Sequence, residues 1–119
     1  MYIAEYISEN VLKNLTAYSK NIKILDPGCG CGIFLVAAIN YIRKNFNIEI
    51  NDIIKNNIYG FDLDENNVRR CKIVLRIYGL INNCDLGDIQ FNLAKEDSLK
   101  INWVSYWKIE HLGKMQKDE

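Results

Sequence analysis

The chain has 119 residues, and its 15 basic and 15 acidic side chains give a formal net charge of zero. This length allows one domain at most, and the charge balance argues against a protein that grips a DNA duplex by itself, because such proteins normally carry a basic surplus. No apolar run approaches the roughly 18 to 20 residues of a membrane span, and no signal peptide is visible, so we expect a cytoplasmic protein.

Apolar residues recur at every third or fourth position from Tyr2 to Tyr18, which predicts an amphipathic helix within residues 1–20. Ile22 to Asp26 predicts a first strand that is buried on both faces. A glycine-rich turn follows this strand, and a helix then continues to about Asn45. The segment from Asn47 to Asn57 is rich in Asn and Asp, and we interpret it as a loop with at most one turn of helix.

Ile58 to Asp62 predicts a second strand, and its spacing from the first fits a right-handed parallel crossover. Asp64 is expected to cap the next helix, and Gly79 to act as its C-terminal cap. The predicted buried face of this helix is formed by Val68, Cys71, Val74 or Leu75, and Tyr78. Its basic residues fall mainly on the other face and indicate a solvated surface rather than a nucleic-acid patch: Arg69, Arg70, Lys72 and Arg76.

A third strand is predicted from Ile89 to Leu93, followed by a loop from Lys95 to Leu99. Residues 21–99 would then form a βαβαβ unit. Residues 100–119 have no firm assignment, although Trp103, Tyr106 and Trp107 indicate a segment that packs. The predicted domain organisation is a single, partial α/β domain over residues 1–119.

The turn between the first strand and its helix has glycines at every second position, Gly28, Gly30 and Gly32, directly after Asp26. Glycines permit positive φ and a close approach of ligand to backbone, and the first amides of the following helix favour polar or anionic groups. A dinucleotide fingerprint would place the third glycine one residue later and an acid about 20 residues on. The turn therefore predicts a nucleotide-type ligand other than a nicotinamide cofactor, and the lysine of a P-loop is missing.

The stretch Asp-Pro-Gly-Cys-Gly-Cys-Gly-Ile-Phe-Leu, residues 26–35, resembles the Asp-Pro-Ala-Cys-Gly-Ser-Gly-x-Phe-Leu loop of adenine-specific DNA N6-methyltransferases from restriction-modification systems. The exchanges at Gly28 and Cys31 add little bulk. The resemblance implies S-adenosylmethionine as cofactor. It also implies part of a class I, Rossmann-like methyltransferase fold, with three parallel strands in the order 3-2-1, flanking helices and an N-terminal helix.

Acids that end or closely follow parallel strands lie along one edge of the sheet, where ligands bind in open α/β folds. The resemblance implies that Asp62 accepts hydrogen bonds from the ribose hydroxyls, Asp97 one from the adenine amino group, and Asp26 lies near the cationic amino-acid end. Leu63 and Leu99 would flank the adenine ring. The implied cofactor-binding residues are Asp26, Pro27, Gly28, Cys29, Gly30, Gly32, Phe34, Asp62, Leu63, Asp97, Ser98 and Leu99.

The family transfers its methyl group at an Asn-Pro-Pro-Tyr type of motif on the fourth strand, where the target base is flipped out of the duplex. Pro27 is the one proline of this chain, so the motif is absent and no catalytic residue is assigned. We therefore expect the cofactor-binding portion of a larger adenine methyltransferase, truncated before its fourth strand and inactive alone. The expected partners are double-stranded DNA in the full-length enzyme and the remaining methyltransferase or target-recognition segment.

Two alternatives stay open: a non-catalytic cofactor-binding or assembly module of a split enzyme, and a methyltransferase for RNA or protein. The four cysteines, Cys29, Cys31, Cys71 and Cys84, lack the paired spacing of a zinc site. We expect them to be free thiols and expect no metal.

Overall fold

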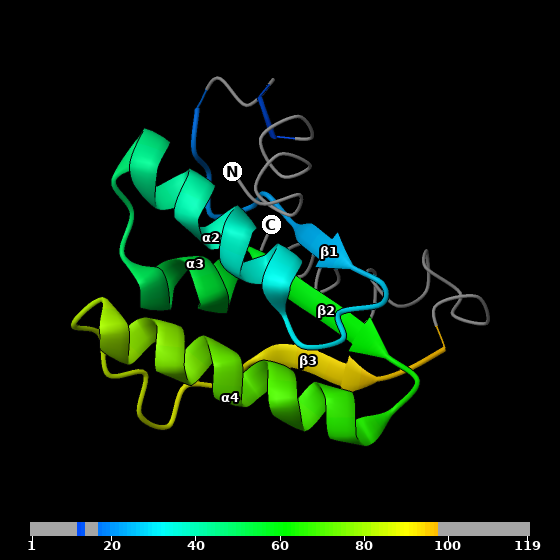
Figure 1. Ribbon diagram of the computed structural model, residues 1–119. Coiled ribbons are helices and arrows are strands. Elements are labelled where there is room, and N and C mark those ends of the chain that lie inside the picture. Colours follow the sequence, from blue (N-terminus) through cyan, green and yellow to red (C-terminus); the bar gives the residue numbers. More distant parts are fainter. Residues whose placement is uncertain (1–11, 14–16, 98–119) are drawn as a thin grey trace, which may run out of the picture.

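The structure is a computed structural model that describes residues 12–13 and 17–97 (Figure 1). Most of the predicted N-terminal helix, the loop residues Ser98 and Leu99, and the aromatic residues Trp103, Tyr106 and Trp107 lie outside this part of the chain. The described elements are β1 (Ile24–Asp26), α2 (Ile33–Phe46), α3 (Ile50–Asn56), β2 (Ile58–Asp62), α4 (Glu65–Ile81) and β3 (Asn92–Lys95).

The three strands form one parallel sheet in the order β1-β2-β3. This order equals the predicted order 3-2-1 read from the other edge, so the prediction of three parallel strands is confirmed. β2 lies in the middle, and its first four residues are buried. Among the described residues β1 pairs only with β2 and forms one edge of the sheet.

The helices lie in front of the strands in Figure 1, with α2 contacting β1 and β2, and α4 contacting β2 and β3. The buried residues of α2 include Leu35, Ala38, Ile39 and Ile42, which share one face at helical spacing. The buried face of α4 contains Val68, Cys71 and Leu75, as predicted. Within the described residues no helix is both long and apolar enough to cross a membrane.

The segment interpreted as a loop between Asn47 and Asn57 contains a helix, α3, and this prediction was wrong. Its Asn and Asp residues indicated a turn, but Ile50, Ile53 and Ile54 have the i, i+3, i+4 spacing of a helical face. All three isoleucines are buried in the core. Burial of that apolar face outweighs the weak helix propensity of the polar residues between them.

The third strand is shifted from its predicted position and runs over Asn92–Lys95. The side-chain amide of Asn92 donates to the carbonyl oxygens of Lys55 at 3.1 Å and Ile58 at 3.2 Å, which places Asn92 beside the start of β2. Strand pairing then continues until Lys95 lies beside Asp62. The apolar residues Ile89 and Phe91, which suggested an earlier start, pack against the core from the preceding segment.

Gly79 does not cap α4, which continues to Ile81 and ends at Asn82. The reason for a glycine is packing, because a Cβ atom at Gly79 would lie 2.7 Å from the carbonyl oxygen of Cys84. The chain after α4 turns back over this position, and the Cys84 amide donates to the Gly79 carbonyl at 2.7 Å. The glycine therefore allows a close chain reversal rather than ending the helix.

Asn57 is a fully buried polar residue between α3 and β2. Its side-chain amide donates to the carbonyls of Ser19 at 3.1 Å and Ile22 at 2.8 Å, and its oxygen accepts from the Tyr18 hydroxyl at 2.8 Å. Buried polar groups need such partners, because each group left unpaired costs free energy. Asn57 thus ties the approach to β1 onto the start of β2.

We expect Asn57→Ala to lower the free energy of unfolding by about 2 kcal/mol, because it leaves two backbone carbonyls and the Tyr18 hydroxyl without their partner. Urea denaturation followed by circular dichroism measures the change. The matched control is Asn51→Ala, since the Asn51 side chain is exposed on α3. Equal stability of the two variants would contradict this role of Asn57.

Candidate functional site

The glycine-rich turn lies at the carboxyl edge of the sheet, between β1 and α2. Gly30 and Gly32 have φ of 50° and 87°, in the left-handed region that favours glycine. The Cys29 amide donates to the Phe61 carbonyl on β2 at 2.8 Å, and the Gly32 amide donates to the Cys29 carbonyl at 2.8 Å. The bond from Cys29 holds the loop against the end of β2. The loop therefore lies at the edge of the sheet where a nucleotide-type ligand is predicted to bind.

The loop and the neighbouring strand β2 pack so closely that one position in each leaves no space for a side chain. A Cβ atom at Gly32 would lie 2.9 Å from the Cys71 sulfur on α4. A Cβ atom at Gly60, on β2, would lie 2.8 Å from the Leu93 side chain and 3.0 Å from the Cys29 Cβ. Gly32 is also the N-cap of α2, where no side chain caps the first amides. The helix N-terminus is therefore open to a ligand.

Asp26 ends β1 and has one carboxylate oxygen without a partner. Its Oδ1 accepts a hydrogen bond from the Gly28 amide at 3.1 Å. Its Oδ2 is buried and accepts no hydrogen bond. Burial raises the pKa of the Asp26 carboxyl, the Gly28 bond lowers it in part, and the nearby Asp62 charge raises it again. A buried acceptor that lacks a donor is suited to a cationic or hydrogen-bonding ligand group.

Asp62 ends β2 and already accepts several protein hydrogen bonds. Its Oδ1 accepts from the Asp64 amide at 2.9 Å and from the Asn67 side chain at 3.2 Å, and its Oδ2 accepts from the Gly30 amide at 3.0 Å. The backbone bond from Asp64 contributes most to lowering the pKa of Asp62. Each carboxylate oxygen has about two lone-pair sites, so Oδ2 can accept one further donor without losing a protein bond.

Asn67 is a residue of this site that the sequence interpretation missed. Its side chain donates a hydrogen bond to Asp62 from the first turn of α4, three residues after the Asp64 cap. Asp64 itself accepts from the Asn66 amide at 2.8 Å, so its predicted role as helix cap is confirmed. The sequence did offer one indication of this role. A helix begins between Asp62 and Asn67, and a polar side chain in its first turn can reach back to the residue that ends the strand.

Exposed apolar side chains border the two acids. Leu63 is 66% exposed beside Asp62, and Phe34 is 42% exposed in the first turn of α2. Both are among the predicted cofactor-binding residues. Solvent-exposed apolar side chains next to polar ones are typical of surfaces that bind a ring system. The predicted flanking residue Leu99, together with Ser98, lies outside the described residues.

Asp97 follows β3 by two residues and lies at the same edge of the sheet as the other two acids. The neighbouring Glu96 amide donates to the Asp62 carbonyl at 3.0 Å, which joins this segment to the end of β2. The structure thus brings Asp26, Asp62 and Asp97 to the ends of three adjacent strands. Their placement agrees with the prediction from strand order, whereas their contacts to a cofactor stay a prediction.

The cysteines are free thiols in the described residues. Cys29 is a buried residue of the glycine-rich turn, Cys71 is buried beside the turn on α4, and Cys31 is exposed. A hydrogen bond between the two buried thiols lowers the pKa of Cys29 and raises that of Cys71, and burial raises the latter further. Over residues 12–13 and 17–97, no group of three metal-binding side chains comes together.

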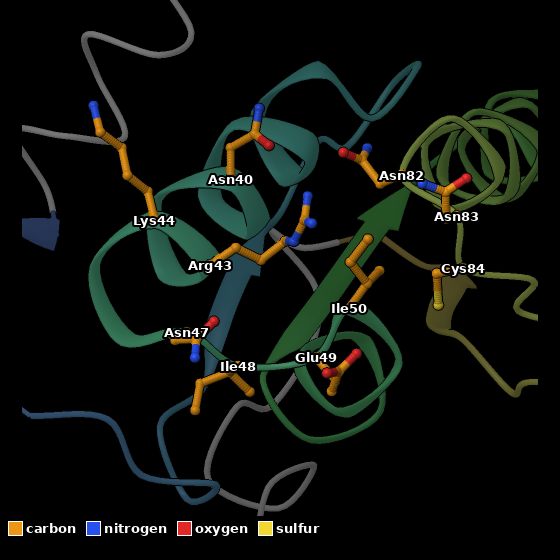
Figure 2. A pocket seen from close by; sticks show the side chains of 10 residues that line it. All are labelled: Asn40, Arg43, Lys44, Asn47, Ile48, Glu49, Ile50, Asn82, Asn83 and Cys84. Atoms are coloured by element: carbon orange, nitrogen blue, oxygen red, sulfur yellow. The ribbon is translucent and has the colours of Figure 1, made fainter.

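A cleft of about 390 Å³ lies away from this site (Figure 2). It is lined by the end of α2, the start of α3 and the segment after α4, and so lies at the amino edge of the sheet. The Arg43 guanidinium donates to the Tyr78 hydroxyl at 3.1 Å, and the side-chain amide of Asn82 donates to the Tyr78 carbonyl at 2.9 Å. Its lining contains none of the predicted cofactor-binding residues, so we assign no cofactor to it.

The sheet, the glycine-rich turn and the acids at the strand ends define a parallel α/β domain with a candidate ligand site at the carboxyl edge of its sheet. The chain belongs to the family described as the MmeI DNA-methyltransferase domain, whose profile matches residues 3–118. It is also 31% identical over 123 aligned positions to a type II restriction enzyme and methyltransferase of Methanocaldococcus jannaschii. That alignment covers 82% of this chain but 10% of the relative, so the chain spans about a tenth of that protein's length.

Proposed function

We propose that this chain holds S-adenosylmethionine at the glycine-rich turn and is the cofactor-binding part of an adenine-specific DNA methyltransferase of a restriction-modification system. The observation that carries the proposal is the unpaired, buried Oδ2 of Asp26 at the end of β1. S-adenosylmethionine has a cationic amino group, and an unpartnered buried carboxylate oxygen favours a cation. Family membership supports this choice, because methyltransferases of this class use that cofactor.

The ribose and adenine would lie next along the edge of the sheet. The free acceptor site on the Asp62 Oδ2 fits one ribose hydroxyl, and a second hydroxyl would compete with Asn67 for Oδ1. The exposed side chain of Leu63 offers an apolar surface for the adenine ring. Asp97 would accept a hydrogen bond from the adenine amino group. When bound, the cofactor supplies an activated methyl group, and the residues named here bind and orient it.

The groups that receive a target adenine have to come from another segment. An Asn-Pro-Pro-Tyr motif needs two prolines, and these 119 residues contain one, Pro27 in the glycine-rich turn. The chain is neutral overall and offers no electrostatic surplus for a duplex. The match to a DNA-methyltransferase family favours DNA over RNA or protein as the substrate of the whole enzyme. DNA binding and base recognition are therefore proposed for the full-length protein.

Isothermal titration calorimetry with the 119-residue chain tests the cofactor proposal. We expect S-adenosylmethionine and its demethylated product to bind at one site, and ATP and NAD to give no comparable heat. Asp62→Ala should weaken binding about tenfold or more, because it removes a charged acceptor and frees the Gly30 amide that Asp62 holds.

The control is Asp52→Ala, which removes an exposed acid on α3 and should leave binding unchanged. Circular dichroism must show that each sample is folded. Absence of heat with S-adenosylmethionine from a folded sample would refute the proposal, and so would equal affinities of the Asp62 variant and the unmodified chain.

The edge position of β1 favours a second candidate, a non-catalytic assembly module of a split enzyme. An edge strand presents unpaired backbone groups that readily pair with another chain. β1 has such an edge among the described residues. Mixing the chain with a separately produced downstream segment of the same gene distinguishes the two candidates. Recovered methylation activity supports the first candidate, the cofactor-binding part of the enzyme, and binding without activity supports the non-catalytic assembly module.

A further inference from the structure

Asn67 lies between an acid and a base, and this fixes the orientation of its side-chain amide. Its Nδ2 donates to Oδ1 of Asp62 at 3.2 Å, and its own Oδ1 accepts from the Arg70 guanidinium at 3.3 Å. The reverse orientation would place the amide oxygen against a carboxylate and the amide hydrogens against a guanidinium, and neither pair can form a hydrogen bond. Asp62 and Arg70 thus hold the half-buried Asn67 with its donor on the carboxylate.

The two carboxylate oxygens of Asp62 are filled unequally. Oδ1 accepts from the Asp64 amide at 2.9 Å and from Asn67, and these two bonds use both of its lone-pair sites. Oδ2 accepts from the Gly30 amide at 3.0 Å and keeps one site. The Asp64 bond lowers the pKa of Asp62 most, burial opposes it, and Gly30, Asn67 and the Leu63 amide lower it further. Among the described residues, the oxygen beside the glycine-rich turn is therefore the one with room for another donor.

We propose that Asn67 is a specificity-determining residue, which makes Asp62 bind one ribose hydroxyl of the cofactor rather than two. A ribose offers two neighbouring hydroxyls, and a carboxylate with both oxygens open can accept a hydrogen bond from each. In this chain one hydroxyl finds the vacant site on Oδ2, whereas the other would have to displace the Asn67 amide from Oδ1. This inference rests on the cofactor-binding function proposed above and specifies how the site recognises the sugar.

The exchange of donors on Oδ1 would bring little gain in free energy. The amide N–H and a ribose hydroxyl are both neutral donors, so the carboxylate would exchange one hydrogen bond for another of the same kind. The displaced amide would lose its partner, and turning it away from Asp62 would also break its alignment with Arg70. Asn67 therefore keeps its place, and the hydroxyl that does not reach Oδ2 makes no bond to Asp62.

Calorimetric titration with S-adenosylhomocysteine and with its 2′-deoxy and 3′-deoxy analogues tests the inference. In the unmodified chain one deoxy analogue should bind about tenfold more weakly than the parent compound and the other within about twofold, because one hydroxyl alone contacts the carboxylate. In Asn67→Ala the Oδ1 site becomes available, and both analogues should bind about five- to tenfold more weakly than the parent compound. Alanine favours a helix, so this variant should fold.

Asn66→Ala is the matched control, because Asn66 is exposed in the same turn and bonds to Asp64 through its backbone amide. It should keep the pattern of the unmodified chain. Equal losses for both analogues in the unmodified chain, or the same pattern in Asn67→Ala, would overturn the inference while leaving the cofactor proposal intact. A folded, unmodified chain that does not bind the parent compound would refute both proposals, so the two failures are distinguishable.

Nuclear magnetic resonance of the side-chain amide follows the hydrogen bond directly. The Asn67 side-chain signals can be assigned by their loss in Asn67→Ala. We expect them to keep the shift of a hydrogen-bonded amide when S-adenosylhomocysteine is added. Movement of these signals to the position of an exposed amide, such as that of Asn66, would show that the ligand displaces Asn67 and would overturn the inference.

Discussion

Asp26→Asn is expected to weaken S-adenosylmethionine binding by about 10- to 100-fold, the range for losing one partly buried, charge-assisted hydrogen bond. The substitution keeps the shape of the side chain and the Oδ1 that accepts from the Gly28 amide. It removes the negative charge beside the buried Oδ2 position, where we place the cationic end of the cofactor. Calorimetric titration of the variant measures the loss.

Asp26→Asn should not lower the free energy of unfolding of the protein without cofactor. This result would distinguish a role of Asp26 in binding from a role in holding the fold together. Burial and Asp62 raise the pKa of Asp26 in the folded state. Below about pH 4, the usual pKa of Asp, the carboxyl is neutral in both the folded and the unfolded protein and the charge costs nothing. As pH rises through the folded-state pKa, the Asp26 carboxyl becomes charged in the folded protein, where burial disfavours the charge. The contribution of Asp26 to the free energy of unfolding therefore falls.

We therefore expect Asp26→Asn to raise the free energy of unfolding by up to about 1 kcal/mol at neutral pH, and the gain to shrink as the solution is acidified. Thermal denaturation of both proteins at several pH values measures the difference. Asp52→Asn on α3 is the control for removing an exposed acid. A variant that loses both stability and binding would show that Asp26 holds the loop together rather than the ligand.

Gly32→Ala should lower the free energy of unfolding by about 2 to 4 kcal/mol. Gly32 has a φ of 87°, and a Cβ atom in the left-handed region costs about 1 to 2 kcal/mol. The new methyl group would also lie 2.9 Å from the sulfur of Cys71, which is fully buried, and overpacking costs about 1 to 3 kcal/mol. Chemical denaturation measures the loss, which is a large share of the stability of an ordinary domain.

Cys71→Ala separates the two causes, because it removes the sulfur atom but leaves the backbone conformation. In that background Gly32→Ala should cost only the part due to φ, so the double-mutant cycle should show a coupling of about 1 to 3 kcal/mol. Gly28→Ala is the matched control, since Gly28 has no atom near its Cβ position and no positive φ. Equal costs of Gly32→Ala in both backgrounds would exclude the steric cause.

Local pattern was enough to place most of the elements from the sequence. The glycine-rich turn between an apolar strand and a helix located β1 and α2, and the alternation of strand and helix indicated a parallel sheet. The same alternation of strand and helix predicted that Asp62 lies at the end of β2. These predictions succeeded because they depend on residues close together in the chain.

Contacts between distant segments decided the rest. α3 forms because three isoleucines find a core to fill, and β3 begins at Asn92 because that side chain meets the carbonyls at the start of β2. Gly79 is needed because the chain reverses after α4 and packs against this position. Local sequence rules for helix ends do not predict such a contact.

The candidate site divides in the same way. The sequence by itself placed Asp26, Asp62 and Asp97 at the carboxyl edge, because parallel strands must all end there. Only the tertiary structure decided that Asp26 keeps an unpaired, buried oxygen while Asp62 is engaged by Gly30, Asp64 and Asn67. Likewise, only the packing of α4 showed which of its apolar residues stay exposed. Hydrogen-bond satisfaction and burial are properties of the assembled fold, so they cannot be read from the order of residues alone.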